Sequence, residues 1–189
     1  GGNSQVTGVW GTAIGVRANT SGLNAAAFGV DANASGAGSL ALGIASKAMG
    51  NYTTAIGPSA NATGYSAIAM GQGAGAHGNT SISVGYGNQV YGDFSGAFGD
   101  PSVINANASY SVGNNNTLAA GQTGVFALGN DISTTTNNSV FLGSNSAYVV
   151  AGTSTKGLSA YTSETLGSGP GAITLSFAGG TPAGVVSVG

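Results

Sequence analysis

The sequence has very little charge, no cysteine and no long apolar run. Charged residues make up 4% of its 189 residues, against about 25% in typical globular domains. Three Lys and Arg in total argue against nucleic acid as a partner, because a phosphate backbone needs a basic surface. The absence of cysteine excludes a disulfide framework and thiolate metal sites. No apolar run approaches the roughly 20 residues that span a bilayer, so we expect no membrane anchor in these residues.

Glycine, in contrast, is abundant and periodic. It occurs 36 times, and it occupies every seventh position from Gly1 to Gly99. Alternate glycines differ in context, since one kind follows an apolar triplet such as "AIG" or "ALG" and the other closes a polar half such as "NASG" or "NATG". The true repeat is therefore a fourteen-residue unit that covers two glycine periods, as from Gly15 to Gly29. It recurs about ten times, with a two-residue slip before "ALG" at 127–129.

A period of seven is typical of coiled coils, but glycine makes a helix improbable here. Each interior glycine costs about 1 kcal/mol relative to alanine in a helix, and the charged positions that flank a coiled-coil seam are missing. Short apolar bursts separated by Gly, Asn, Ser and Thr instead predict short strands and turns. Two strands per repeating unit make one coil of a β-solenoid. The coil is too short for three faces, so we expect a flattened, two-sided roll.

Alternation along each strand predicts which side chains face the interior. We place large apolar residues inside, namely those one residue before the first kind of glycine: Ile14, Phe28, Leu42, Ile56, Met70, Val84, Phe98, Val112, Leu128 and Leu142. In the second strand the small residues Ala18, Ala32, Ala60, Ala62, Ala74 and Ala76 are expected to face them. Arg17, Asn19, Asp31, Asn33, Lys47, Asn61 and Gln89 are expected on the solvent face.

The other side of the first strand carries small uncharged residues. Because a solvated face normally collects Lys and Glu, we expect this surface to be buried against copies of the same chain. The predicted contact residues of this homo-oligomer are Ala13, Ala27, Ala41, Ala55, Ala69, Ser83 and Ala97. Cyclic symmetry about an axis parallel to the rolls is the natural closure.

Two regions depart from the repeat. A roll is expected over residues 1–147, distorted near 100–124, where Ala106 replaces a glycine and the two-residue slip follows. Residues 148–189 form a second, non-repeat β segment in this prediction, in which Pro170 marks a turn between two short strands.

Catalytic and metal-binding constellations are scarce. The acidic residues Asp31, Asp93, Asp100, Asp131 and Glu164 lie far apart in the repeat, and His77 is the only histidine. We therefore expect no enzymatic activity, no cofactor and no metal site. Met49, His77 and Tyr91 share one column at an outer corner, where we expect an exposed ridge with neighbours two coils, or roughly 10 Å, apart. Tyr and Met are favoured at interaction surfaces, so the ridge is a candidate ligand contact, with a tolerant turn as the alternative.

The units "NYTTAIGPSANATG" and "GYSAIAMGQGAGAHG" resemble the head repeats of trimeric autotransporter adhesins, the YadA-like heads. The segments "NDISTTTNNSVFLG" at 130–143 and "FAGGTPAGVVSVG" at 177–189 resemble the late head repeat and the approach to the neck of that family. The resemblance implies a left-handed parallel β-roll, three chains side by side in each head, and chain crossing to neighbours in residues 148–189. It also implies a Gram-negative cell-surface protein that is held in the outer membrane by an anchor absent from this sequence.

The function expected from this resemblance is non-enzymatic adhesion. The head would attach bacteria to host extracellular-matrix proteins, cell-surface receptors or glycans, or to each other, through many weak contacts multiplied by avidity. A glycan-binding or ice-binding structural solenoid is the alternative. Ice binding favours one outward column of near-uniform Thr, and no column of this repeat is that regular.

Overall fold

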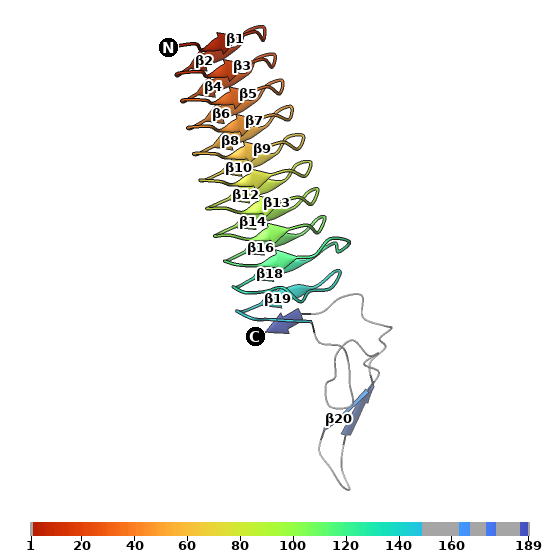
Figure 1. Ribbon diagram of the computed structural model, residues 1–189. Helices are drawn as coiled ribbons and strands as arrows, with labels where there is room; N and C mark the ends of the chain where they lie inside the picture. The colour runs from red at the N-terminus through yellow and green to blue at the C-terminus, as the bar shows by residue number, and fades with distance from the viewer. Residues whose placement is uncertain (1, 149–162, 167–172, 177–185, 189) are drawn as a thin grey trace.

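The computed structural model describes residues 2–148, 163–166, 173–176 and 186–188. Within them all regular structure is β, and the strands β1–β19 stack into one long roll (Figure 1). From β1 to β18 successive strands alternate between two parallel sheets, so each of these coils contributes one strand to each sheet, whereas β19 joins β18 in the same sheet. The predicted all-β solenoid of two-strand coils is confirmed.

The described strands form a nine-stranded and an eleven-stranded sheet. The nine-stranded sheet has the order β1 (Gln5–Val6), β3 (Asn19–Thr20), β5 (Asn33–Ala34), β7 (Lys47–Ala48), β9 (Asn61–Ala62), β11 (Gly75–Ala76), β13 (Gln89–Val90), β15 (Val103–Ile104) and β17 (Thr117–Leu118). The eleven-stranded sheet has the order β2 (Thr12–Ile14), β4 (Ala26–Phe28), β6 (Leu40–Leu42), β8 (Thr54–Ile56), β10 (Ile68–Met70), β12 (Ile82–Val84), β14 (Gly96–Phe98), β16 (Tyr110–Val112), β18 (Phe126–Leu128), β19 (Val140–Leu142) and β22 (Val186–Val188).

The register of the sheets follows the repeat. Ile68 pairs with Ile82, exactly one repeating unit later in the sequence, so equivalent positions of successive coils lie side by side. Two tight corners close each coil. The first corner leads from the eleven-stranded to the nine-stranded sheet and contains Arg17 in the first coil; the second corner leads back and contains Asn24. Both residues have left-handed backbone conformations, with φ of 56° and 55°, which Asn, Asp and Gly adopt most readily.

The periodic glycines are explained by close stacking of the corners. A Cβ built on Gly36 would lie 1.8 Å from the carbonyl oxygen of Gly50 in the next coil, and one built on Gly64 would lie 1.9 Å from that of Gly78. Such contacts with backbone cannot be relieved by a rotamer change. Glycine at these corners is therefore a requirement of coil-on-coil contact rather than of backbone flexibility.

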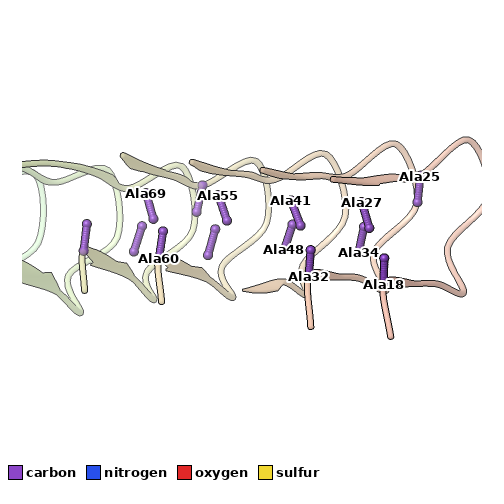
Figure 2. Packing of buried hydrophobic residues seen from close by; sticks show 14 residues of the cluster. Ala18, Ala25, Ala27, Ala32, Ala34, Ala41, Ala48, Ala55, Ala60 and Ala69 are labelled. Carbon is purple, nitrogen blue, oxygen red and sulfur yellow. The ribbon is translucent and has the colours of Figure 1, made fainter. Parts of the chain in front are cut away.

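The core of the roll consists of small side chains from both sheets. Ala27, Ala41, Ala55 and Ala69 of the eleven-stranded sheet and Ala34, Ala48 and Ala62 of the nine-stranded sheet are all fully buried. Figure 2 shows six of them, Ala27, Ala34, Ala41, Ala48, Ala55 and Ala69, between the two rows of strands. The prediction was thus correct for the interior of the second strand.

For the first strand the predicted orientation is wrong. Ile14, Leu42 and Met70 are 59%, 43% and 41% exposed, and they point out of the roll while their alanine neighbours point in. The physical reason is that two tight corners hold the sheets of the regular coils so close together that alanines from both walls fill the space between them. Alternation separates the two sides of a strand, but it does not say which side is inside.

The slip distorts the roll at the second corner and leaves the eleven-stranded sheet intact. Tyr110 pairs with Phe126, which lies two positions beyond the regular spacing of the repeat. The extra residues are therefore absorbed outside the ladder, in the turn at 119–122. Nearby the core residues become larger, with Val90, Ile104, Leu118 and Phe141 fully buried. The expected distortion near 100–124 is found at this corner, and the nine-stranded sheet ends at β17, just before it.

In the remaining segment, β20 (Ser163–Leu166) and β21 (Ile173–Ser176) pair as an antiparallel hairpin. These are the two short strands expected around Pro170, although Pro170 itself lies outside the described residues. The strand β22 pairs in parallel with β19 and extends the eleven-stranded sheet.

Candidate functional site

The outer face of the eleven-stranded sheet is uncharged and mostly apolar. Two columns of each strand point outward, and in residues 2–148 neither contains a charged residue. Eight large hydrophobic side chains in these columns are more than a third exposed in the single chain: Ile14, Leu42, Met70, Phe98, Tyr110, Val112, Phe126 and Leu128. An exposed apolar surface of this extent is typical of an interaction site.

This arrangement overturns the predicted contact residues between chains. Six of them, Ala27, Ala41, Ala55, Ala69, Ser83 and Ala97, are completely buried within their own chain, and Ala13 is half-buried against the same core. A side chain without exposed surface in the single chain has no surface to offer to another one. The smallness of these residues reflects the narrow interior of the roll.

The outer face of the nine-stranded sheet is polar by comparison. It carries Asn19, Asn33, Lys47 and Gln89, as expected for a solvated face, and these side chains are exposed or half-buried. The predicted ridge also lies here, beside the second corner. Met49 is 45% and Tyr91 52% exposed, while His77 is half-buried.

Within the ridge the predicted even spacing is wrong between His77 and Tyr91. The two residues occupy equivalent positions of consecutive coils, and their rings stack with centroids 4.8 Å apart and planes inclined by 18°. Met49 lies two coils before His77, and Thr63 occupies the intervening coil. The ridge is thus a stacked ring pair with an isolated thioether, rather than three evenly spaced contacts.

Both ring nitrogens of His77 have partners in the roll. Nδ1 lies 3.0 Å from Thr63 Oγ1, and Nε2 lies 3.1 Å from Gln89 Oε1. Because Gln89 donates its own Nε2 to Gly73 O, its oxygen faces the imidazole. In neutral His77 the proton therefore resides on Nε2, and Nδ1 accepts from the Thr63 hydroxyl. Gly75 leaves the space for this contact, since a Cβ there would lie 2.6 Å from His77 Nε2.

An ion pair and a shallow hollow mark the first coils. Arg17 donates from Nε to Asp31 Oδ1 at 2.6 Å, and this hydrogen bond holds the pKa of the Asp31 carboxyl below its usual range. The same bond raises the pKa of the Arg17 guanidinium. Beside the pair is an open hollow of about 500 Å³, lined by Asn3, Ser4, Gln5, Arg17 and Asn19. Its lining is polar, but the guanidinium charge is already neutralised by Asp31.

A cluster of metal-binding side chains does not occur in the described part of the chain. No three His, Asp or Glu side chains there lie close enough to hold a metal ion. The same residues contain no helix that is long and apolar enough to cross a membrane. The candidate functional features are therefore surfaces: the apolar outer face, the polar outer face and the corners.

One functional feature of the corners escaped the sequence reasoning. Asn and Asp side chains at the corners accept hydrogen bonds from the backbone N–H of the equivalent residue one coil earlier, as Asn79 Oδ1 does from Tyr65 N at 3.1 Å. The ladder continues through Asp93 and Asn107, whose Oδ1 atoms accept from Asn79 N and Asp93 N. The recurrence of Asn at one column of the repeat was the available signal.

Comparison with known families agrees with this architecture. The family described as YadA head domain repeat (2 copies) matches residues 7–32, 21–46, 34–60 and 48–74, in steps of about one coil. No curated protein matches the sequence significantly. The matched residues include β2 to β10, where the coils are most regular. Residues 7–74 of this chain therefore match the YadA head domain repeat, the repeat of YadA-like adhesin heads.

Proposed function

We propose that this chain is the head of a bacterial surface adhesin that works as a homotrimer and attaches the cell to host matrix, to host cell surfaces or to other bacteria. The observation that carries the proposal is the mostly apolar outer face of a roll whose residues 7–74 match YadA head domain repeats. Proteins of this family are adhesins exposed at the cell surface and anchored in the outer membrane. Their heads are non-enzymatic structural domains.

The apolar outer face supports association of identical rolls. Leu42 and Met70 lie in one outward column, in strands whose register advances by one coil from each strand to the next. Identical rolls placed side by side present the same columns in the same order, so a single mode of contact repeats along the whole length. Three copies around an axis parallel to the rolls would cover this face in every chain. Burial of exposed apolar side chains supplies the driving force.

Sedimentation of single-charge variants tests this assembly. Leu42→Glu places a carboxylate on the apolar face, and Lys47→Glu places one on the opposite face of the same coil. We expect the parent and Lys47→Glu to sediment with the mass of three chains at micromolar concentration, and Leu42→Glu to shift toward one chain. A parent that sediments as a single chain, or a Leu42→Glu variant that remains trimeric, would contradict the proposed interface.

If the apolar faces meet, the polar faces point outward and become the adhesive surface. The ridge of Met49, His77 and Tyr91 would then be exposed in each of the three chains. Because both nitrogens of His77 are engaged within the roll, the ridge offers ring surface, the Tyr91 hydroxyl and the Met49 thioether. Such a surface suits weak contacts that are multiplied by three chains and many copies of the head.

Solid-phase binding of the purified protein tests the adhesive role. The panel contains collagen, fibronectin, laminin and a set of glycans, since the uncharged surface suits either class. We expect the triple variant Met49→Ser, His77→Ser and Tyr91→Ser to lose at least tenfold in apparent affinity. The matched control replaces Val16, Val30 and Tyr86, which are similarly exposed at the first corner, and should bind like the parent. Equal loss in both variants would argue against the ridge.

The alternative functions make different predictions. A glycan-binding head would bind members of the glycan set and none of the deglycosylated matrix proteins. An ice-binding solenoid would show thermal hysteresis, which we do not expect because the outward columns lack uniform Thr. Residues 148–189 are proposed to lead toward the neck and to cross to neighbouring chains. In the trimer, β22 of one chain would then pair with β19 of a neighbouring chain, in the way that the two strands pair within the single chain.

A further inference from the structure

We propose that the asparagines of the second corner, Asn51, Asn79, Asn107 and Asn137, are acceptors for an N-linked sugar that is added before the roll folds. The motif Asn-x-Ser/Thr is the acceptor sequence for this modification. It occurs eight times in the sequence, at Asn19, Asn33, Asn51, Asn61, Asn79, Asn107, Asn115 and Asn137. The inference does not depend on the proposed adhesive function.

The side-chain geometry separates the corner asparagines from the others. At all four corner positions Oδ1 accepts a backbone N–H of the preceding coil: from Ala37, Tyr65, Asp93 and Thr123, at distances of 2.9–3.1 Å. Each of the four residues is exposed. Since the oxygen must face the N–H donor, Nδ2 points away from the ladder, and no hydrogen bond to it is found within the described residues. Nδ2 is the atom that carries the sugar in an N-linked glycan.

At other acceptor sequences the same nitrogen is engaged. Asn19 donates Nδ2 to Asn33 Oδ1, and Asn115 donates it to Asp131 Oδ1 at 2.7 Å. A sugar on either nitrogen would replace one of its two hydrogens and place a bulky group beside the accepting side chain, which would crowd these contacts. Asn33 and Asn61 are half-buried on the outer face of the nine-stranded sheet, where neighbouring coils crowd them. The folded roll therefore has room for a sugar at the corner positions in particular.

The hydroxyl of the acceptor sequence accompanies the corner asparagine. Two positions after each corner asparagine the sequence has a hydroxyl residue. These residues are Thr53 after Asn51, Ser81 after Asn79, Ser109 after Asn107 and Ser139 after Asn137. At the six corners without Asn, the residues at this same position are Gly11, Ala25, Ser39, Ala67, Ser95 and Val125. The column thus tolerates apolar residues, yet it supplies a hydroxyl after each Asn. The Asp93 corner, which makes the same ladder bond, serves as a natural non-acceptor.

The timing follows from burial of these hydroxyls. Thr53, Ser81 and Ser109 are completely buried, and Ser139 is 2% exposed. A transferase that requires the hydroxyl cannot reach it in the folded roll, so the sugar must be added to the unfolded chain. The folded protein then retains sugars at the corners, because only there does an attached sugar allow the coils to stack. In the transfer, Asn Nδ2 bonds to the anomeric carbon of a sugar activated as a diphosphate ester. The bond from that carbon to the diphosphate oxygen breaks, the diphosphate leaves, and Nδ2 loses one proton to a base.

Exposed rings on the same corner would border an attached sugar. Tyr52 follows Asn51 directly and is 60% exposed, and Tyr65, whose N–H bonds to Asn79, is 53% exposed. The C–H face of a sugar ring packs well on an aromatic face. The second corner lies at the edge of the roll, outside the outward columns of the apolar face. A sugar there does not cover the residues proposed to join the three chains.

Peptide mapping by mass spectrometry tests the proposal on the chain isolated from the cells that produce it naturally. We expect added hexose mass on the peptides with Asn51, Asn79, Asn107 and Asn137. The peptides with Asn114 and Asn130, corner residues outside acceptor sequences, should be unmodified. One hexose per site indicates a nucleotide-activated donor, and a larger oligosaccharide indicates a lipid-linked diphosphate donor. Unmodified corner asparagines, or equal modification at all eight motifs, would overturn the proposal.

Three variants produced in the same cells make the test sharper. Ser81→Ala removes the hydroxyl of one acceptor sequence, and Ser39→Ala is its control, because both hydroxyls are buried without a hydrogen-bond partner. Both should fold like the parent, but only Ser81→Ala should lose the sugar on Asn79. Asp93→Asn creates a new acceptor sequence with Ser95 while keeping the ladder oxygen, and should gain a sugar at that corner. Sugar on Asn79 in Ser81→Ala would contradict the assignment.

A comparison of folded and unfolded acceptor tests the order of events. Unmodified protein is incubated with a soluble N-glycosyltransferase and a nucleotide-activated hexose, either folded or in the urea concentration that unfolds it and that the enzyme tolerates. We expect at least a tenfold higher corner occupancy in the unfolded sample. Equal occupancy in the folded sample would overturn the requirement for modification before folding.

Discussion

His77 and Tyr91 lie one coil apart on the outer face of the nine-stranded sheet, and their rings stack at a centroid distance of 4.8 Å. The stack depends on the register of the coils, which places the two residues directly above one another. Such ring pairs contribute about 0.5–1.5 kcal/mol beyond the area that they bury. The pair therefore stabilises the junction of two coils as well as shaping the outer surface.

Removal of the stack should lower stability measurably. We expect Tyr91→Ala to reduce the free energy of unfolding by about 1 kcal/mol in urea titrations at a fixed protein concentration. Tyr86→Ala is the matched control, since Tyr86 is similarly exposed and makes no ring contact among the described residues. A loss in Tyr86→Ala as large as in Tyr91→Ala would show that the stack contributes nothing specific.

Neighbouring alanines on opposite sides of β4 should respond differently to enlargement. Ala27→Leu forces a large side chain into the narrow interior, where Ala13 and Ala41 are its neighbours in the sheet. We expect a loss of about 1–3 kcal/mol, the usual cost of overpacking. Ala26→Leu points outward beside Leu40 and should cost far less. Urea unfolding of both variants checks the orientation of the strand, and the reverse ranking would contradict it.

The alanine at position 106 and the two-residue slip that follows it should depend on each other for stability. Gly92, at the same corner one coil earlier, has no room for a side chain, since a Cβ there would lie 1.8 Å from Ala106 O. Ala106 itself carries a Cβ, and the enlarged turn at 119–122 follows it in the next coil. We infer that the larger turn makes space for this methyl group.

Deletion of Ala119 and Ala120 tests this coupling, because it restores a coil of regular length beneath Ala106. The deletion should lower the melting temperature by several degrees, and adding Ala106→Gly should recover most of the loss. Ala106→Gly in the parent chain is the control and should change little. Equal effects of the deletion in both backgrounds would contradict the coupling.

The Arg17–Asp31 pair should make stability depend on pH only under acid conditions. The pKa of Asp31 is lowered by its hydrogen bond to Arg17, so the folded state favours the ionised carboxyl. The contribution is fully present above the ordinary Asp value of about 3.9, and it is lost as the pH falls through the lower folded value. Because both side chains are exposed, the effect should be small and reduced by salt.

Melting temperatures of the parent and Asp31→Asn, measured from neutral to acid pH, check this prediction. Asn suits the left-handed backbone at this position, where φ is 58°, so the comparison isolates the charge. The difference between the two proteins should be constant above about pH 5 and shrink in acid. A difference that grows as the pH falls would contradict the sign of the pKa change.

Much of the fold follows from the repeat alone. Fourteen-residue spacing of the two kinds of glycine determines the coil length, and the corner glycines are required because equivalent corners of successive coils touch, as at Gly36 and Gly50. The location of the slip also follows from the spacing. The candidate ridge follows from the repeat, because Met49, His77 and Tyr91 share one column. Its spacing is uneven, since Met49 lies two coils before His77 and Tyr91 lies one coil after it.

The faces of the first strand could not be deduced in the same way. Period-two alternation distinguishes Ala41 from Leu42, but only the distance between the two sheets decides which of them is inside. The preference of large apolar side chains for the interior failed because this coil has no interior wide enough for them. The exposed apolar face that results is the surface that supports the proposed assembly of three chains.

The sequence by itself determined the period, the turns and the uncharged character of this protein, because these are properties of residue order and composition. The tertiary structure decided what each column faces, because orientation depends on how closely the corners draw the two sheets together. It also decided that the corner asparagines bond through Oδ1 and leave Nδ2 to solvent, since only coil stacking brings the N–H of Tyr65 to the side chain of Asn79.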